Sequence, residues 1–174
     1  KNIKNSVLST YNEKVISKYG DFGGEYKLGS NVLVESIDGV GTKSVLLKRL
    51  MGKKGLEVCG HDLVSHCVND ILVSGADPML FLDYFASSKL DKEEIGYFIK
   101  GVSDMCKEVG CVLLGGETAE MPGTYEKNKF DLAGFAVGVV DKKFLITKNK
   151  IKKNNIILGI PSSGLHSNGY SLVR

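Results

Sequence analysis

The apolar positions of the chain fall into stretches of helical spacing and stretches of strand spacing, which follow one another along the sequence. Apolar side chains at steps of three and four residues predict helices over 1–19, 44–51, 56–76 and 91–109. Short β-branched and aromatic runs predict strands over 31–37, 79–86, 111–114, 130–140 and 155–160. Another helix is expected to begin at Tyr170. Because strands alternate with helices, the expected fold class is α/β.

Glycine is concentrated at four places between these elements. The chain has 21 glycines among 174 residues, against a usual share of about 7%. The clusters occupy 20–29, 38–41, 115–116 and 164–169, and the first of them is expected to be a flexible loop. At 38–43 a strand runs into a glycine turn and then a helix. Free backbone N–H groups are exposed at such a junction, and anions bind there.

Charge and composition exclude several classes of function. The net charge is +3 with only two arginines, so the basic face of a nucleic-acid-binding protein is not expected. No stretch approaches the roughly 20 apolar residues of a membrane span, and the expected location is the cytoplasm. The four cysteines show no metal or disulfide spacing and are expected to be reduced and mostly buried.

Polar residues on the long helix at 56–76 are the strongest chemical signal. Asp62, His66 and Asp70 are spaced by four, so they recur along one side of an otherwise apolar helix. Asp38 and Glu117 follow predicted strands, and oxygen ligands of this kind favour Mg²⁺. These residues could also face solvent, stabilise a turn at Asp38, or pair Glu117 with a lysine. Metal-assisted phosphoryl chemistry is the leading hypothesis from the residues alone.

Six motifs, in order and spanning nearly the whole chain, resemble one family. They are Asp38-Gly-Val-Gly-Thr-Lys43, Asp62-Leu-Val with Cys67-Val-Asn-Asp70 and Gly75-Ala-Asp-Pro78, Phe81-Leu-Asp-Tyr84, Gly115-Gly-Glu-Thr-Ala-Glu-Met-Pro-Gly123, Ala133-Gly-Phe135 with Gly138-Val-Val140, and Ser162 to Arg174. The resemblance is to phosphoribosylformylglycinamidine cyclo-ligase, also called aminoimidazole ribonucleotide synthetase. It implies a ligase of purine biosynthesis that uses ATP and Mg²⁺ to convert formylglycinamidine ribonucleotide to aminoimidazole ribonucleotide, ADP and phosphate.

The resemblance also implies an architecture. A mixed sheet with flanking helices would form a half-barrel that pairs with a second subunit in a homodimer, with strands 31–37, 79–86, 111–114 and 130–140 contributing. Residues 1–150 would be the domain that binds ATP and metal and makes the dimer. Residues 151–174 would begin a second α/β domain, since family members are about twice as long as this chain. The chain alone would then hold an incomplete active site.

Carried over residue by residue, the resemblance implies a set of site residues. Asp38, Asp70 and Glu117 would hold the metal. The nucleotide would be bound by Gly23, Gly24, Lys27, Asp38, Gly39, Gly41, Thr42, Lys43, Asp62, Asn69, Glu117 and Thr118. The substrate would be bound by Ser162, Ser163, Gly164, His166 and Asn168. Lys43 and His166 would be catalytic, whereas His66 is not assigned a catalytic role.

Two other interpretations remain. Formylglycinamidine ribonucleotide synthetase, selenophosphate synthetase, thiamine monophosphate kinase and a hydrogenase maturation factor share the carboxylate layout, but the strings at 115–123 and 166–174 favour the cyclo-ligase. The chain could also be a non-catalytic module that binds nucleotide or forms a dimer.

Overall fold

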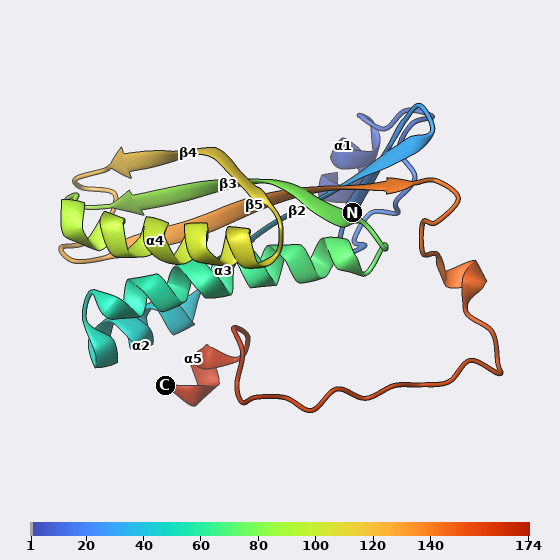
Figure 1. Ribbon diagram of the computed structural model, residues 1–174. Coiled ribbons are helices and arrows are strands. Elements are labelled where there is room, and N and C mark those ends of the chain that lie inside the picture. The colour runs from blue at the N-terminus through green and yellow to red at the C-terminus, as the bar shows by residue number, and fades with distance from the viewer. Residues whose placement is uncertain (1) are drawn as a thin grey trace.

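The computed structural model describes residues 2–174, in which single helices or strands and pairs of them follow one another along the chain (Figure 1). The strands are β1 (Gly24–Leu28), β2 (Asn31–Gly39), β3 (Asp77–Ser87), β4 (Val112–Glu120) and β5 (Phe130–Asp141). The helices are α1 (Asn2–Leu8), α2 (Thr42–Met51), α3 (Lys54–Leu72), α4 (Lys92–Glu108) and α5 (Tyr170–Val173), with a 3₁₀ turn at Lys148–Lys150. The expected α/β class is confirmed.

The strands form one mixed, open sheet in the order β1-β2-β5-β3-β4. β3 and β4 are parallel, because helix α4 carries the chain back between them, and the other neighbours are antiparallel. Helices α2, α3 and α4 lie on one face of the sheet (Figure 1). Among residues 2–174, no helix covers the other face of β5, β3 and β4. No helix in this part of the chain is long and apolar enough to span a membrane.

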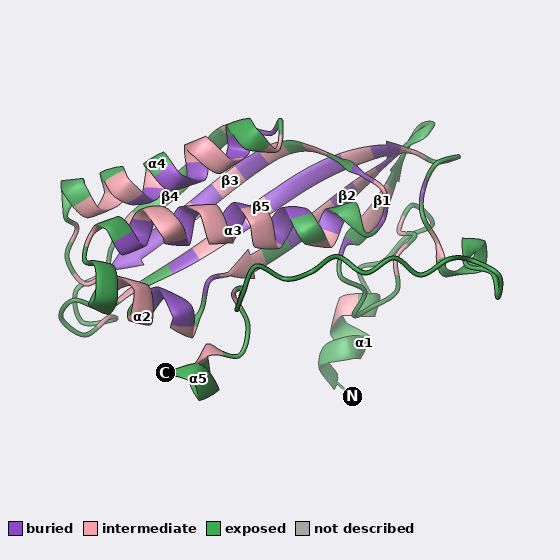
Figure 2. Ribbon diagram, turned by 60° about the horizontal axis from the view of Figure 1, so that its bottom comes forward, coloured by how far each residue is buried: buried purple, intermediate pink, exposed green. Residues whose placement is uncertain are grey.

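The core lies between the sheet and helices α3 and α4, and buried residues occur on the strands and on both helices (Figure 2). Phe81 and Phe85 of β3 are buried, and the rings of Phe85 and Phe98 lie 5.5 Å apart between centroids. The two helices approach closely at Gly101. A Cβ atom built there would lie 2.0 Å from the carbonyl oxygen of Glu57. Helix α4 therefore reaches the core only because this position lacks a side chain.

Strand alternation assigns the polar side chains of β2 and β4 to opposite faces of the sheet. Ser36 contacts Asp70 of α3, so Ser36 and Asp38, two residues on, both face the helices. On β4, a Cβ atom at Gly116 would contact the buried Asp83, which places Gly116 on the helix-covered face. Glu117 therefore lies on the open face, in a row with Tyr84 of β3.

The N-terminal segment differs from the expected helix over 1–19 and the expected loop over 20–29. Helix α1 ends at Leu8, and the Ser9 and Thr10 hydroxyls bond back to carbonyls of the last turn. Val15 forms an isolated bridge with Tyr26, and residues 24–28 form β1, which pairs with β2. Between residues 15 and 28, pairing with the sheet outweighs the local sequence pattern, because it gives the backbone N–H and C=O groups of β2 hydrogen-bond partners.

Three further elements differ most from the sequence pattern: the helix α3, the strand β4 and the expected strand over 155–160. Helix α3 ends at Leu72, and β4 continues through the two glycines to Glu120 because β3 supplies a parallel partner along its whole length. The expected strand over 155–160 is absent from the described structure. Its apolar side chains are exposed, Ile157 by 95%, and no strand of residues 2–174 pairs with this segment. A β-prone segment forms no ladder of backbone hydrogen bonds when no partner strand lies beside it.

Candidate functional site

Three polar residues of α3 form a row along the side of the helix that faces α2 and the end of β2. Asp62, His66 and Asp70 recur at steps of four, as the sequence pattern predicted, and each contacts a partner from another element. The Nζ of Lys43 lies 2.6 Å from Asp62 Oδ2, Asp38 Oδ2 lies 2.6 Å from His66 Nε2, and the Ser36 hydroxyl donates to Asp70 Oδ2 at 2.9 Å. The row is half-buried, so these polar groups are paired within the chain.

Lys43 lies in the first turn of α2, directly after the glycine turn that ends β2. The chain reverses at Gly41, whose φ of 64° is the left-handed conformation that glycine tolerates. Helix α2 then begins at Thr42 without a side-chain cap; the N–H of Ser44 donates to the Gly41 carbonyl oxygen, and the N–H groups before it can meet an anion. The Lys43 side chain is only 9% exposed, and its ammonium group lies 5.5 Å from the centre of the Tyr170 ring.

Asp38 at the end of β2 faces the row on α3, in which His66 and Asp70 are consecutive members. Asp38 ends β2, where one carboxylate oxygen accepts the N–H of Gly39 at 2.7 Å and the other contacts His66. His66, which contacts Asp38, lies one turn of α3 from Asp70, a rise of about 6 Å. Asp38 is 43% exposed. Carboxylates so placed fit a hard, oxygen-bound cation such as Mg²⁺.

Glu117, the third carboxylate of the predicted metal set, lies elsewhere in this chain. It sits on the open face of β4, in the cross-strand row Gly39, Ala133, Tyr84 and Glu117. Three strand spacings separate it from β2, which is about 14 Å at ~4.8 Å per strand. Thr118 follows it on β4. Within a single chain, Asp38 and Asp70 both lie between β2 and α3, each in contact with the other element, and Glu117 lies at the far edge of the sheet.

The glycine segment predicted to cover a nucleotide begins next to Asp70. A Cβ atom at Gly23 would lie 2.8 Å from Val34 Cγ1 and 3.6 Å from the Asp70 carbonyl oxygen. Gly24 starts β1, and Lys27, also on β1, has an exposed side chain. Asn69 is exposed on α3, beside the row. The structure therefore places the start of this loop against the carboxylate row.

The predicted substrate residues lie in an exposed segment that returns to the same end of the molecule. Within it, Ser162 Oγ lies 3.3 Å from His166 Nε2, and Ser162 also accepts the N–H of Gly164 at 3.3 Å. Ser163 and Asn168 are in the same segment, without regular secondary structure. Helix α5 follows and contacts α2 through Tyr170 and Lys43 (Figure 1). Residues 162–168 are thereby connected to the Lys43 end of the row.

Sequence reasoning did not identify three features of this region. Ser36 donates a hydrogen bond to Asp70. It lies two residues before Asp38 on a predicted strand, and the alternation of side chains along a strand is the signal that would have placed both on one face. His66 is a direct partner of Asp38, a contact that its helical spacing alone could not show. Asp83 is a buried carboxyl of β3, and burial raises its pKa. Asp83 lies midway between Phe81 and Phe85 on the same face of β3, and a polar residue within an apolar face is the sequence signal that would have identified it.

Comparisons with known proteins define the class of protein from the fold. A protein of Thermus thermophilus, tt0281, superposes with a TM-score of 0.62 and 18% identity, over 80% of this chain and 43% of the other. PurL of T. maritima, solved with ADP, gives 0.58 and 18%, over 82% and 22%. A thiamine-monophosphate kinase from Stenotrophomonas maltophilia K279a gives 0.55 and 16%, over 81% and 42%. These likenesses show a shared α/β fold.

The sequence comparisons are more specific. Residues 20–140 match the family model described as AIR synthase related protein, N-terminal domain. The chain belongs to this family. Phosphoribosylformylglycinamidine cyclo-ligases of Alkaliphilus oremlandii and Lawsonia intracellularis are 50% and 52% identical to it over 99% of its length. The chain covers 51% and 50% of those relatives, so it spans about half the length of the curated relatives that it matches.

Proposed function

We propose that this chain supplies the N-terminal domain of an enzyme that closes the imidazole ring of formylglycinamidine ribonucleotide with ATP. The products would be aminoimidazole ribonucleotide, ADP and phosphate. The observation that carries the proposal is the identity of about 50%, over 99% of the chain, to proteins named as the cyclo-ligase. The fold relatives add support for a nucleotide, because PurL of T. maritima was solved with ADP and with ATP.

The geometry supports distinct roles for different residues in this reaction. ATP would phosphorylate the formamide oxygen, and an amidine nitrogen would then attack the activated carbon and expel phosphate. Lys43 and the free amides at the start of α2 would bind phosphate oxygens, with the glycine turn at Gly39 and Gly41 allowing close approach. Asp38 and Asp70 would hold Mg²⁺, which neutralises phosphate charge when bound. Such a site accelerates the reaction mainly by positioning and electrostatics.

The remaining assignments are proposals of the same kind. His166 and Ser162 would contact the substrate from the segment that ends near Lys43. Residues 1–150 would form one domain and 151–174 would begin another. The exposed apolar run at 156–160 supports this division, because such side chains are normally covered. A cytoplasmic location follows from the reaction proposed.

Product formation tests the function. Formylglycinamidine ribonucleotide, Mg²⁺ and ATP are incubated with this chain and, in parallel, with a full-length version extended to the length of its relatives. We expect ADP and aminoimidazole ribonucleotide in equal amounts from the full-length protein. No product there would refute the cyclo-ligase assignment. Product from full length only, with ATP binding by both, would show that the chain holds part of the site.

Replacing Asp70 by asparagine is expected to weaken ATP binding about tenfold or more in Mg²⁺ and to remove most of its Mg²⁺ dependence. The amide keeps the bond from Ser36 through its oxygen but loses the charge that a hard cation requires. Isothermal titration with ATP at several Mg²⁺ concentrations measures both effects. Asp77→Asn, at the exposed start of β3, is the matched control. An unchanged Mg²⁺ dependence in Asp70→Asn would contradict the metal assignment.

A homodimer through the open face of the sheet is the partner that we propose for this chain. Ile37 of β2 and Val112 and Leu114 of β4 lie on this face and are 71%, 56% and 62% exposed. Aligned apolar positions on an uncovered sheet normally mark an interface. Sedimentation velocity is expected to show a dimer at micromolar concentration, and Ile37→Glu to convert it to a folded monomer. A wild-type chain that sediments as a monomer would refute this interface.

A further inference from the structure

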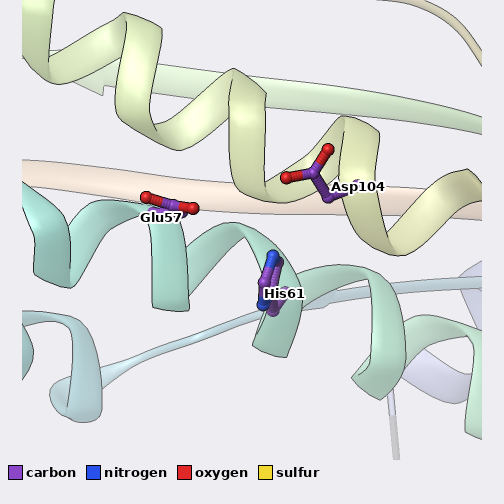
Figure 3. Close-up of side chains that lie close together, drawn as sticks. All are labelled: Glu57, His61 and Asp104. Atoms are coloured by element: carbon purple, nitrogen blue, oxygen red, sulfur yellow. The ribbon is translucent and has the colours of Figure 1, made fainter. Parts of the chain in front are cut away.

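The surface where α3 meets α4 carries a second cluster of metal-ligating side chains. Glu57 and His61 lie one turn apart on α3, and Asp104 faces them from α4 (Figure 3). One ligand atom from each residue lies within 4.8 Å of the others. Within residues 2–174 this is the only group of three such residues that meets this distance. It is separate from the row at Asp62, His66 and Asp70.

The imidazole of His61 is the member of this cluster without a partner. Its Nε2 is buried and makes no hydrogen bond within the described chain. A buried ring nitrogen that accepts or donates nothing is unfavourable, because it has lost the hydrogen bond that water would supply. The spacing from Glu57 to His61 puts both side chains on one face of α3. Helices use this spacing to present two ligands to one metal ion.

Lys100 already shows that the two carboxylates attract a cation. Its Nζ lies 2.6 Å from Glu57 Oε1 and 2.7 Å from Asp104 Oδ2. The hydrogen bonds to Asp104 and then to Glu57 raise the pKa of Lys100, so the bound group is the charged ammonium. The lysine side chain is nevertheless 57% exposed, so it can turn into solvent without leaving a cavity. The ammonium group of Lys100 interacts with the two carboxylates only by donating hydrogen bonds to their oxygens.

We propose that Glu57, His61 and Asp104 form a binding site for a borderline transition-metal dication such as Zn²⁺, which displaces the ammonium group of Lys100. The exchange replaces a single charge by a double charge between two carboxylates and gives a ring nitrogen of His61 a ligand bond. One nitrogen and two oxygen donors suit Zn²⁺ or Co²⁺ better than Mg²⁺, which prefers oxygen alone. A bound ion would join α3 to α4 and leave a fourth position for water.

Metal titration of the purified chain, without nucleotide, tests the site. Zn²⁺ binding is measured by isothermal titration, and Co²⁺ binding by its visible absorption under reducing conditions. We expect one ion per chain that depends on His61, separate from any divalent ion at Asp38 and Asp70, and no thiolate-to-cobalt band, since the four cysteines are buried elsewhere. His61→Gln is expected to weaken Zn²⁺ binding at least tenfold. Lys100→Met is expected to tighten it several-fold, because the competing cation is gone.

The other two histidines provide matched controls. His66→Gln and His166→Gln make the same chemical change at Asp38 and in the exposed C-terminal segment, and both should leave the affinity of the His61-dependent Zn²⁺ ion within twofold. Asp104→Asn, on the opposite helix, should weaken binding like His61→Gln, and thermal melts without metal confirm that each variant is folded. Unchanged Zn²⁺ affinity in His61→Gln, or loss of the same ion in His166→Gln, would overturn the proposal. Because ATP is absent, the result is independent of the proposed reaction.

Discussion

Replacing Lys43 by methionine is expected to weaken ATP binding at least tenfold and to destabilise the chain by about 2 kcal/mol. The stability loss follows because Asp62 would be left half-buried without its partner at 2.6 Å. It should fall below the roughly 3–5 kcal/mol of a fully buried pair, because the Asp62 side chain keeps 20% exposure. Urea unfolding and ATP titration measure the two effects separately.

The double variant Lys43→Met/Asp62→Asn separates structure from binding. With both charges removed, no unpaired carboxylate remains, so most of the stability should return. ATP affinity should stay low, because no ammonium group is available to the phosphates. Asp62→Asn alone releases Lys43 and should retain ATP binding. If the double variant regained wild-type ATP affinity, Lys43 would act only through the ion pair.

Replacing Gly101 by alanine is expected to destabilise the chain by about 3 kcal/mol. The added methyl group would lie 2.0 Å from the Glu57 carbonyl oxygen and 2.8 Å from its carbonyl carbon. These are backbone atoms of α3, which cannot rotate away, so the two helices would have to separate. The midpoint and slope of urea unfolding measure the change.

Gly96 provides the control on the same helix. A Cβ atom there would meet no heavy atom within 4 Å. Gly96→Ala should therefore stabilise the chain by about 0.5–1 kcal/mol, the helix propensity difference between the two residues. Equal effects of the two substitutions would show that the close approach of α3 and α4 is not what requires glycine at 101.

The agreement between sequence and structure differs from element to element. Helix α4 was predicted almost to the residue from its apolar spacing, a local signal, and Asp91 caps it by accepting the N–H groups of Glu93 and Glu94. Strand β1 was missed, because its pattern is mostly polar and glycine-rich and its pairing with β2 is what makes it a strand. The run at 155–160 is the opposite case: its apolar, β-branched pattern predicts a strand, but no strand forms because no other strand of residues 2–174 pairs with it.

The candidate site divides in the same way. The step of four between Asp62, His66 and Asp70 is a property of the helix period, so the sequence determined by itself that they share one side of α3. It also determined the family, through motifs that run in order along the chain. Which groups pair with that row, Lys43, Asp38 and Ser36, depended on how α2 and β2 pack against α3.

Only the tertiary structure decided the faces of the sheet and the contacts between helices. It set Glu117 on the open face, three strands from Asp38. A register shift of one residue along β4 would have put Glu117 on the other face, so the pairing of β4 with β3 decides its position. It also brought Asp104 to Glu57 and His61, which are far apart in sequence from it. Local patterns follow from the geometry of a single helix or strand, whereas these placements arise from the packing of several elements at once.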